Sequence, residues 1–187
     1  MTYQRPNEFP NGAGYLPCSE HYNRAFADVF GLVHRKEALL LYFAYTARIS
    51  PEEMANVAPG AEFQFIAHLP QWGLEFPMKN RTWGGGLPTV KPEEGSTVWG
   101  AVFSVPEDEF DQLDAVETSE KRTATTIEAM DRTGKRHQVT VHLHEGRRNG
   151  TYDPSAEYVQ LMLSGSKHWS LPAGWIAGLE EHLSNGR

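Results

Sequence analysis

The stretch TVWGAVFSVPEDEFDQLDAVE (Thr97–Glu117) combines the two kinds of secondary structure that define this fold. Its first part, Thr97–Val105, is rich in β-branched and aromatic residues and predicts a strand. Its second part begins with Pro106 and three acidic residues, which is typical of a first helical turn because acids face the positive end of the helix dipole. We therefore expect a strand that leads directly into a helix ending near Glu117.

Strand patterns continue on both sides of this stretch. Ala38–Tyr45 is a continuous apolar run of strand length, which predicts a central strand buried on both faces. Shorter strands are predicted at Phe63–Leu69, Leu74–Met78, Leu87–Val90, Thr123–Met130 and Gln138–His144. The last two flank a turn at 131–134 and predict an antiparallel hairpin.

Helical patterns lie toward the ends of the chain. Ser50 and Pro51 mark a helix start, with Ser as the N-cap and Pro at the first position. Two more helices are predicted in the tail, one across Tyr158–Gly165 and one after Pro172. Because short strands fill the middle without regular βαβ alternation, the predicted class is α+β. Residues 1–37 are interpreted as an arm and a helix, followed by a domain at 38–187.

The composition excludes several classes of protein. The 187 residues fit one compact domain, and the net charge of −7, from 17 Lys+Arg and 24 Asp+Glu, argues against a nucleic-acid partner. The single cysteine, Cys18, excludes an intramolecular disulfide and a cysteine-based zinc site. Since the sequence shows no apolar run of the roughly 18 residues that a membrane helix needs, we expect a soluble, cytoplasmic protein without a membrane partner. A homodimer remains open.

Glu117 has the most informative position in the sequence. Phe110, Leu113 and Glu117 lie at i, i+3 and i+7 of the predicted helix, so the glutamate shares its apolar face. It also lies near the negative end of the helix dipole. Burial and dipole both disfavour its charged form, as suits a general acid–base residue near neutral pH. A frayed helix end with Glu117 in solvent is the alternative interpretation.

Two other patterns have a weaker chemical meaning. Gly84–Gly86 either lets a substrate approach the backbone or forms an ordinary loop. His142 and His144 are two residues apart on a predicted strand and share a face, as two metal ligands would, but no third ligand stands at a recognisable spacing. A polar strand face is the simpler interpretation, and we predict no metal and no cofactor.

Several segments, taken in order, resemble the γ-glutamylcyclotransferase-like superfamily. They are Leu41–Tyr45, Trp83–Val90, Val98–Phe103, Leu113–Glu117 and Pro154–Tyr158, followed by Gly165-Ser166 and Leu171-Pro172. The resemblance covers most of the chain from Leu40 to Leu183. It implies a compact mixed β-barrel with surrounding helices, and a catalytic carboxylate at Glu117.

The resemblance also implies a reaction. In that family the α-amino group of a γ-glutamyl amide attacks its own γ-carbonyl, which gives 5-oxoproline and releases an amine. Intramolecular attack has a low entropic cost if the enzyme holds the substrate folded. One carboxylate can take the proton of the ammonium group and then give it to the leaving amine, so Glu117 is expected to act as base and then as acid.

The chain departs from the family in the loop that grips the glutamyl part of the substrate. The family has Tyr-Gly-Ser-Asn, and here the loop reads Tyr45, Thr46, Ala47, Arg48. The arginine introduces a planar cation suited to a carboxylate. A glycine after the catalytic glutamate and a tyrosine a few residues on are also replaced. We expect a kept acid–base residue and a rebuilt substrate grip.

The predicted substrate site therefore has one catalytic residue and two lining segments. Tyr45, Thr46, Ala47 and Arg48 are expected to bind the substrate, and Gly85 and Gly86 are expected to line the pocket. Two alternatives to the cyclising enzyme stay open. One is an amide hydrolase or acyltransferase that activates an external nucleophile, and the other is a non-catalytic ligand-binding protein on the same fold.

Overall fold

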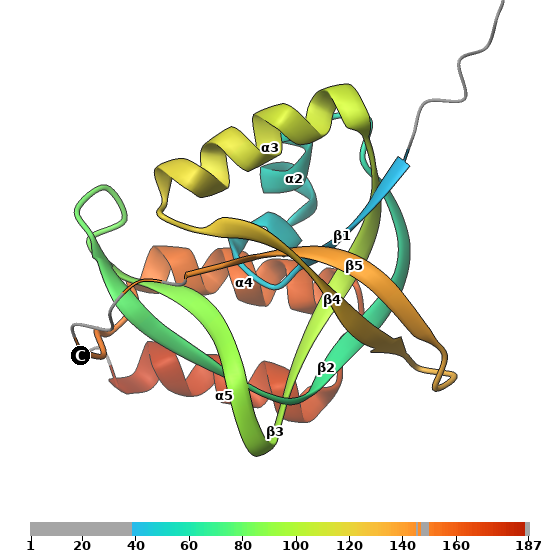
Figure 1. The fold of residues 1–187 in the computed structure, drawn as a ribbon. Coiled ribbons are helices and arrows are strands. Elements are labelled where there is room, and N and C mark those ends of the chain that lie inside the picture. Colours follow the sequence, from blue (N-terminus) through green and yellow to red (C-terminus); the bar gives the residue numbers. More distant parts are fainter. Residues whose placement is uncertain (1–38, 145, 147–149, 186–187) are drawn as a thin grey trace, which may run out of the picture. The chain divides into compact units, whose positions relative to one another are not determined.

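The computed structural model describes residues 39–144, 146 and 150–185, which form a closed barrel of five strands with helices around it (Figure 1). The strands are β1 (Leu39–Ala44), β2 (Glu62–Asn80), β3 (Gly85–Pro106), β4 (Thr123–Asp131) and β5 (Arg136–Leu143). Their order around the barrel is β1-β3-β2-β4-β5. Because β1 pairs antiparallel with β3 and parallel with β5, the predicted α+β class with a mixed barrel is confirmed. The arm and helix predicted at 1–37 lie outside the described residues.

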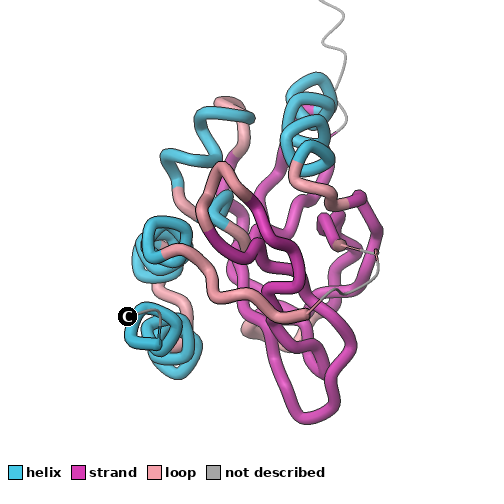
Figure 2. Tube along the Cα trace, turned by 90° about the vertical axis from the view of Figure 1, so that its left-hand side faces the viewer, coloured by secondary structure: helices cyan, strands magenta, loops and turns pink. Residues whose placement is uncertain are grey.

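The helices confirm the predictions for the rest of the chain. They are the 3-10 turn η1 (Ala47–Ile49), α2 (Pro51–Val57), α3 (Glu107–Ser119), α4 (Ala156–His168) and α5 (Ala173–Asn185). Helices α4 and α5 lie side by side along one side of the barrel, whereas α2 and α3 lie toward one end (Figures 1 and 2). Within the described part of the chain, every helix is too short or too polar to cross a membrane.

Strands β2 and β3 form one long antiparallel ladder that extends to Asn80 opposite Gly85. We predicted four short strands in this region, and that division is wrong. The register shifts between Pro70 and Trp72 and again between Glu75 and Met78. These bulges bend the ladder, and pairing continues beyond Pro70, a residue type that usually interrupts a strand. The resulting curvature lets two strands wrap around much of the barrel (Figure 1).

The second half of β1, Tyr42–Ala44, is buried on both faces, as the apolar run predicts, whereas the strand begins at the surface. Tyr42 and Ala44 belong to a core cluster that includes Leu113 of α3. Phe43 and Tyr45 belong to a second cluster, contributed mainly by the strands. Alternate side chains of β1 therefore join the helical layer to the barrel core, and the loop after β1 starts from a fixed position.

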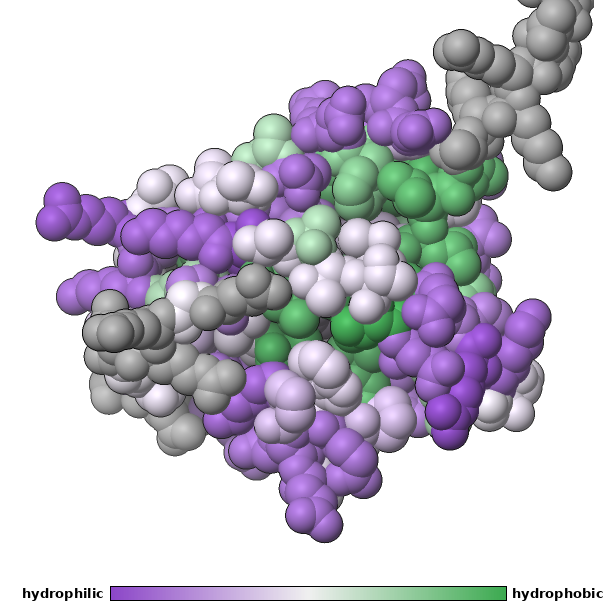
Figure 3. Space-filling model, in the orientation of Figure 1, coloured by the Kyte–Doolittle hydropathy of each residue, from purple (hydrophilic) through white to green (hydrophobic). Residues whose placement is uncertain are grey.

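The surface separates polar from apolar residues. On the face shown in Figure 3, polar side chains cover the ends of the hairpins, and apolar side chains gather near the start of β1. Leu39, the first residue of β1, is 60% exposed, and Phe63 at the start of β2 is also exposed. Among the described residues these are the only exposed large hydrophobic side chains, so most of the apolar content lies in the core.

Helix α4 packs directly on the η1 turn, and this contact supports a first prediction. A Cβ at Gly165 would lie 2.4 Å from backbone atoms of Ile49. Gly165→Ala is expected to lower the free energy of unfolding, measured by urea denaturation, by about 1–3 kcal/mol through overpacking. Gly178→Ala is the control, because α5 has open space there and alanine in a helix stabilises by about 0.5–1 kcal/mol. Equal effects at the two positions would contradict the packing argument.

The turn between β4 and β5 is organised by Asp131. Its Oδ1 accepts hydrogen bonds from the backbone N–H of Thr133 at 2.8 Å, from the Thr133 hydroxyl at 2.6 Å and from the backbone N–H of Lys135 at 3.1 Å. His137 Nε2 lies 2.8 Å from Oδ2. The hydrogen bond from the Thr133 side chain, and to a smaller extent the one with His137, holds the pKa of Asp131 well below its usual range. The ionised form therefore stabilises the folded state.

This lowered pKa predicts a pH-dependent effect of Asp131→Asn. The ionised carboxylate contributes fully above the ordinary aspartate pKa of about 3.9, and its contribution is lost as the pH falls through the lowered pKa. The variant is expected to unfold at a lower temperature than wild type at pH 7, with a difference that narrows below about pH 4. Thermal unfolding followed from pH 7 to pH 2 measures this. A constant difference across the range would show that the charge of Asp131 has no part in it.

Candidate active site

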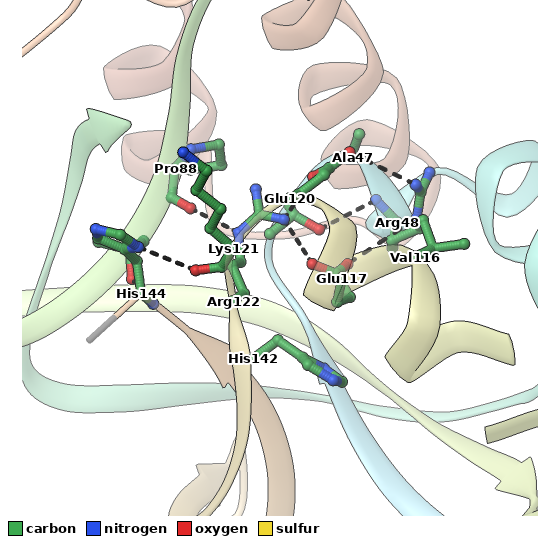
Figure 4. A network of polar contacts seen from close by, with 12 residues as sticks. Ala47, Arg48, Pro88, Val116, Glu117, Glu120, Lys121, Arg122, His142 and His144 are labelled. Carbon is green, nitrogen blue, oxygen red and sulfur yellow. Dashed lines mark hydrogen bonds and ion pairs between the residues drawn. The ribbon is translucent and has the colours of Figure 1, made fainter. Parts of the chain in front are cut away.

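Glu117 lies inside the protein at the end of α3 (Figure 4). Leu113 and Glu117 are the buried residues of this helix, and the glutamate is 1% exposed. The helical spacing therefore predicted its direction, and the interpretation as a frayed helix end is wrong. Such a carboxylate needs compensating partners, because removing a charge from water is costly.

Arg122 is the main partner of Glu117. Its Nη1 lies 2.5 Å from Oε2 of Glu117 and 2.6 Å from Oε2 of Glu120. Its Nε donates to the carbonyl oxygen of Pro88 at 3.0 Å, and its Nη2 donates to the hydroxyl of Tyr158 at 3.2 Å. All three nitrogens of this fully buried guanidinium are engaged, so its position is fixed by α3, β3 and α4 together.

The backbone after α3 brings Arg122 back over the helix end. Lys121 has a φ of 64°, in the left-handed region, and reverses the chain there. The N–H of Arg122 then donates to the carbonyl oxygen of Glu117 at 3.1 Å. Burial by itself lowers the pKa of Arg122, but Tyr158 and Glu117 outweigh it and the pKa lies well above its ordinary value. Arg122 is therefore a permanent cation next to Glu117.

Arg48 approaches the same carboxylate from the η1 turn. Its Nη1 lies 2.6 Å from Oε2 of Glu53, whereas its Nε is 4.0 Å from Oε1 of Glu117 and its Nη2 is 3.9 Å from Oε1 of Glu120. Although the Arg48 side chain is only 9% exposed, its Nε has no hydrogen-bond partner among the described residues. The Nε–Nη2 edge is the one that binds carboxylates in a bidentate way; here it faces Glu117 and Glu120 only at the outer limit of ion-pair distance.

Three buried tyrosines surround the two arginines and the glutamate. The Tyr42 hydroxyl donates to Oε1 of Glu117 at 3.4 Å, and the Tyr45 hydroxyl donates to the carbonyl oxygen of His142 at 2.7 Å. The Tyr158 hydroxyl accepts from the N–H of Ala47 at 3.4 Å. Burial raises the pKa of Tyr42, Tyr45 and Tyr158 above the ordinary value. All three phenols therefore stay protonated; Tyr42 and Tyr45 donate hydrogen bonds, whereas the Tyr158 oxygen accepts them from Ala47 and Arg122.

The predicted loop residues come together at this site. Tyr45, Thr46, Ala47 and Arg48 are all buried. Thr46 Oγ1 accepts from the N–H of Arg48 at 3.3 Å and caps the η1 turn. Ala47 is linked to Glu117 through Tyr158 and Arg122. The turn is thus held in one conformation beside the carboxylate.

Gly85 and Gly86 lie at the start of β3 and face a different segment. A Cβ at Gly85 would be 2.3 Å from the backbone N of Ser155, and one at Gly86 would be 2.5 Å from the carbonyl oxygen of Tyr152. The N–H of Gly86 donates to the carbonyl oxygen of Asp153 at 2.8 Å. These glycines therefore permit a close backbone contact with the 152–155 segment. Their assignment as pocket residues stays a prediction.

Residues near the glycines, rather than the glycines themselves, reach the carboxylates. Trp83 Nε1 donates to Oε1 of Glu120 at 3.1 Å. The carbonyl oxygen of Pro88 accepts a hydrogen bond from Nε of Arg122, the partner of both carboxylates. Sequence reasoning missed both contacts, as it missed Arg122. Among the described residues no group of three His, Cys, Asp or Glu side chains is arranged to hold a metal ion.

A closed mixed barrel with a carboxylate buried at the end of α3 is the γ-glutamylcyclotransferase-like fold, and the comparisons agree. Residues 97–179 match the AIG2-like family. A solved structure called gamma-glutamyl cyclotransferase superposes with a TM-score of 0.71 at 25% identity, covering 76% of this chain and 87% of the other.

Curated relatives support the same family. Gamma-glutamylcyclotransferase of Bos taurus is 27% identical over 136 residues, which is 71% of this chain and 72% of the relative. The protein of the same name from Homo sapiens is 27% identical over 140 residues, which is 73% of this chain and 74% of the relative. The chain is therefore γ-glutamylcyclotransferase-like in both sequence and fold.

The buried ion pair predicts a large effect of removing one partner. Arg122→Met removes the nearer cation of Glu117 and Glu120, leaves only the more distant Arg48, and is expected to lower the free energy of unfolding by about 3–5 kcal/mol. Adding Glu117→Gln to this variant is expected to recover part of the loss, because the uncompensated charge disappears. Urea denaturation of the single and double variants measures both effects.

The exposed pair between Arg136 and Glu128 provides the control for this prediction. Its side chains are 66% and 44% exposed, so Arg136→Met is expected to cost at most about 1 kcal/mol. A comparable loss of stability in Arg122→Met and Arg136→Met would contradict the role given to the buried pair. So would an Arg122→Met, Glu117→Gln double variant whose loss equals the sum of the losses in its two single variants.

Proposed function

We propose that the chain is an enzyme that cleaves a γ-glutamyl or related amide by intramolecular attack, releasing 5-oxoproline and an amine. The observation that carries this proposal is the carboxylate of Glu117, which is buried at the barrel end beside the loop after β1. The relatives named gamma-glutamylcyclotransferase support it. Glu117 acts as base and then as acid.

The two oxygens of Glu117 have different surroundings, and this assigns the proton transfers. Oε2 is held by Arg122 at 2.5 Å, whereas the contacts of Oε1 are longer, 3.4 Å to the Tyr42 hydroxyl and 4.0 Å to Nε of Arg48. We assign the proton exchange to Oε1. It takes a proton from the substrate's ammonium group, the nitrogen bonds to the γ-carbon, and the proton passes to the amine as the amide C–N bond breaks.

Arg48 is the proposed anchor for a carboxylate of the substrate. Its Nε–Nη2 edge has no short contact, and Glu53 holds its other end at 2.6 Å. A bidentate ion pair on this edge places the bound ligand within reach of Oε1 of Glu117. Because Glu117 is almost fully buried, binding requires the side chains that cover it to move.

A second candidate function is ligand binding without catalysis. The observation in its favour is the ion pair with Arg122, which already engages Oε2 of the carboxylate. Hydrolysis, or transfer to an external amine, is a third candidate that uses the same carboxylate. The identity of the product separates these candidates, because cyclisation alone gives 5-oxoproline.

A mass-spectrometric assay with γ-glutamyl dipeptides and γ-glutamyl amines tests the proposal. Wild type is expected to release 5-oxoproline, and Glu117→Gln is expected to lower kcat by about 10²- to 10⁴-fold, the usual contribution of a general acid–base residue. Arg48→Ala is expected to raise KM by roughly 10- to 100-fold through loss of a charged hydrogen-bonding partner, with Arg48→Lys in between.

The outcomes of this assay are distinct. Release of free glutamate in place of 5-oxoproline would indicate hydrolysis. Binding of the substrates without any product would indicate the ligand-binding function. Full activity of Glu117→Gln would contradict the assignment of the reaction to this carboxylate.

A further inference from the structure

Two histidines on β5 and just beyond it contact the segment that carries the site. His142 Nε2 lies 2.8 Å from Oδ1 of Asp114, and His144 Nδ1 lies 3.0 Å from the carbonyl oxygen of Lys121. Asp114 is one helical turn before Glu117, and Lys121 directly follows α3 and its cap. The segment is therefore held near both of its ends by β5 and the residue just after it; Figure 4 shows the contact between His144 and Lys121.

His142 also connects this segment to the loop after β1. It is fully buried, with Asp114 as its polar partner. Its carbonyl oxygen accepts from the Tyr45 hydroxyl at 2.7 Å, while its ring lies between the rings of Tyr42 and Phe110 at 5.7 and 6.0 Å. The carboxylate of Asp114 favours the tautomer with the proton on Nε2. One residue thus sets the distance between α3 and the β1 loop.

His144 has the corresponding role at the other end of the segment. Its backbone N–H donates to Oγ1 of Thr89 at 2.9 Å, which fixes His144 to β3. Its ring nitrogen Nδ1 forms the hydrogen bond with the carbonyl oxygen of Lys121. Lys121 is a non-glycine residue in the left-handed region, a conformation that persists only when surrounding contacts hold it. The histidine contact is one of these, and Arg122 follows immediately in the chain.

We propose that His142 and His144 are positioning residues, which hold the carboxylate of Glu117 and the guanidinium of Arg122 in register with the Tyr45–Arg48 loop. The pair acts through hydrogen bonds to Asp114 and to the Lys121 carbonyl. Since His142 bonds to Asp114 and His144 bonds to the Lys121 carbonyl, the effect on Glu117 passes through α3 and its terminal turn. The kinetic part of this inference rests on the proposed cyclising function.

The variants are chosen where the protein tolerates change. Asp114 is 44% exposed and His144 is partly exposed, so neither substitution empties the core. His144→Asn keeps a donor close to Nδ1 and His144→Ala removes it. Asp114→Asn keeps an acceptor for His142, and Asp114→Ala removes it. His168→Ala, on an exposed histidine at the end of α4, is the control.

Steady-state kinetics on a γ-glutamyl amide that wild type turns over give the first readout. His144→Ala and Asp114→Ala are expected to lower kcat by about 10- to 100-fold, as a small misplacement of a reacting group does, with little change in KM. The two Asn variants are expected to recover most of the loss. Unchanged kcat in both Ala variants, or equal losses in the Ala and Asn variants, would overturn the proposal.

The indole N–H resonance of Trp83 gives a readout that needs no activity. Trp83 donates to Glu120, which also binds Arg122, so this resonance reports the position of the turn. His144→Ala is expected to shift it, His144→Asn to restore it, and His168→Ala to leave it unchanged. A resonance unaffected by His144→Ala would overturn the positioning role. If wild type forms no 5-oxoproline, the proposed function fails while this resonance still decides the role of His144.

Discussion

The buried ion pair between Glu117 and Arg122 is the contact on which the rest of the site depends. Two charges have been removed from water, and neither is tolerated there without the other. Arg122 satisfies its remaining nitrogens with Pro88 of β3 and Tyr158 of α4. The barrel, the helix that carries the glutamate and the C-terminal helical layer are therefore held in one arrangement by a single guanidinium.

The same pair makes the two oxygens of Glu117 unequal. One is fixed by Arg122, and the other faces Tyr42 and Nε of Arg48 through longer contacts. A carboxylate held in this way keeps its orientation, and the proposed reaction uses the less tightly held oxygen. The placement of Arg48 on the η1 turn, which α4 supports through Gly165, gives the site a second cation, whose contacts with Glu117 and Glu120 are long.

Much of the fold follows from local patterns, but the contacts of the site do not. The periodicity of α3 places Glu117 inward with Leu113, and the turn at 131–134 defines the β4–β5 hairpin. The partner Arg122 was missed because its position depends on the left-handed Lys121, where glycine is usual. The long β2–β3 ladder was missed because its bulges at breaker residues are set by pairing with the opposite strand. The long distances from Nε and Nη2 of Arg48 to the two glutamates depend on the tertiary structure, and no local sequence pattern predicts them.

The most direct test of the account is a crystal structure of the Glu117→Gln variant with a γ-glutamyl amide bound. The account predicts a carboxylate of the ligand on Nε and Nη2 of Arg48 at hydrogen-bond distances of about 2.7–2.9 Å. It also predicts the reacting nitrogen within about 3.2 Å of the side chain at 117, directly or through one water molecule. A ligand bound elsewhere on the barrel, with Nε of Arg48 still unpartnered, would contradict it.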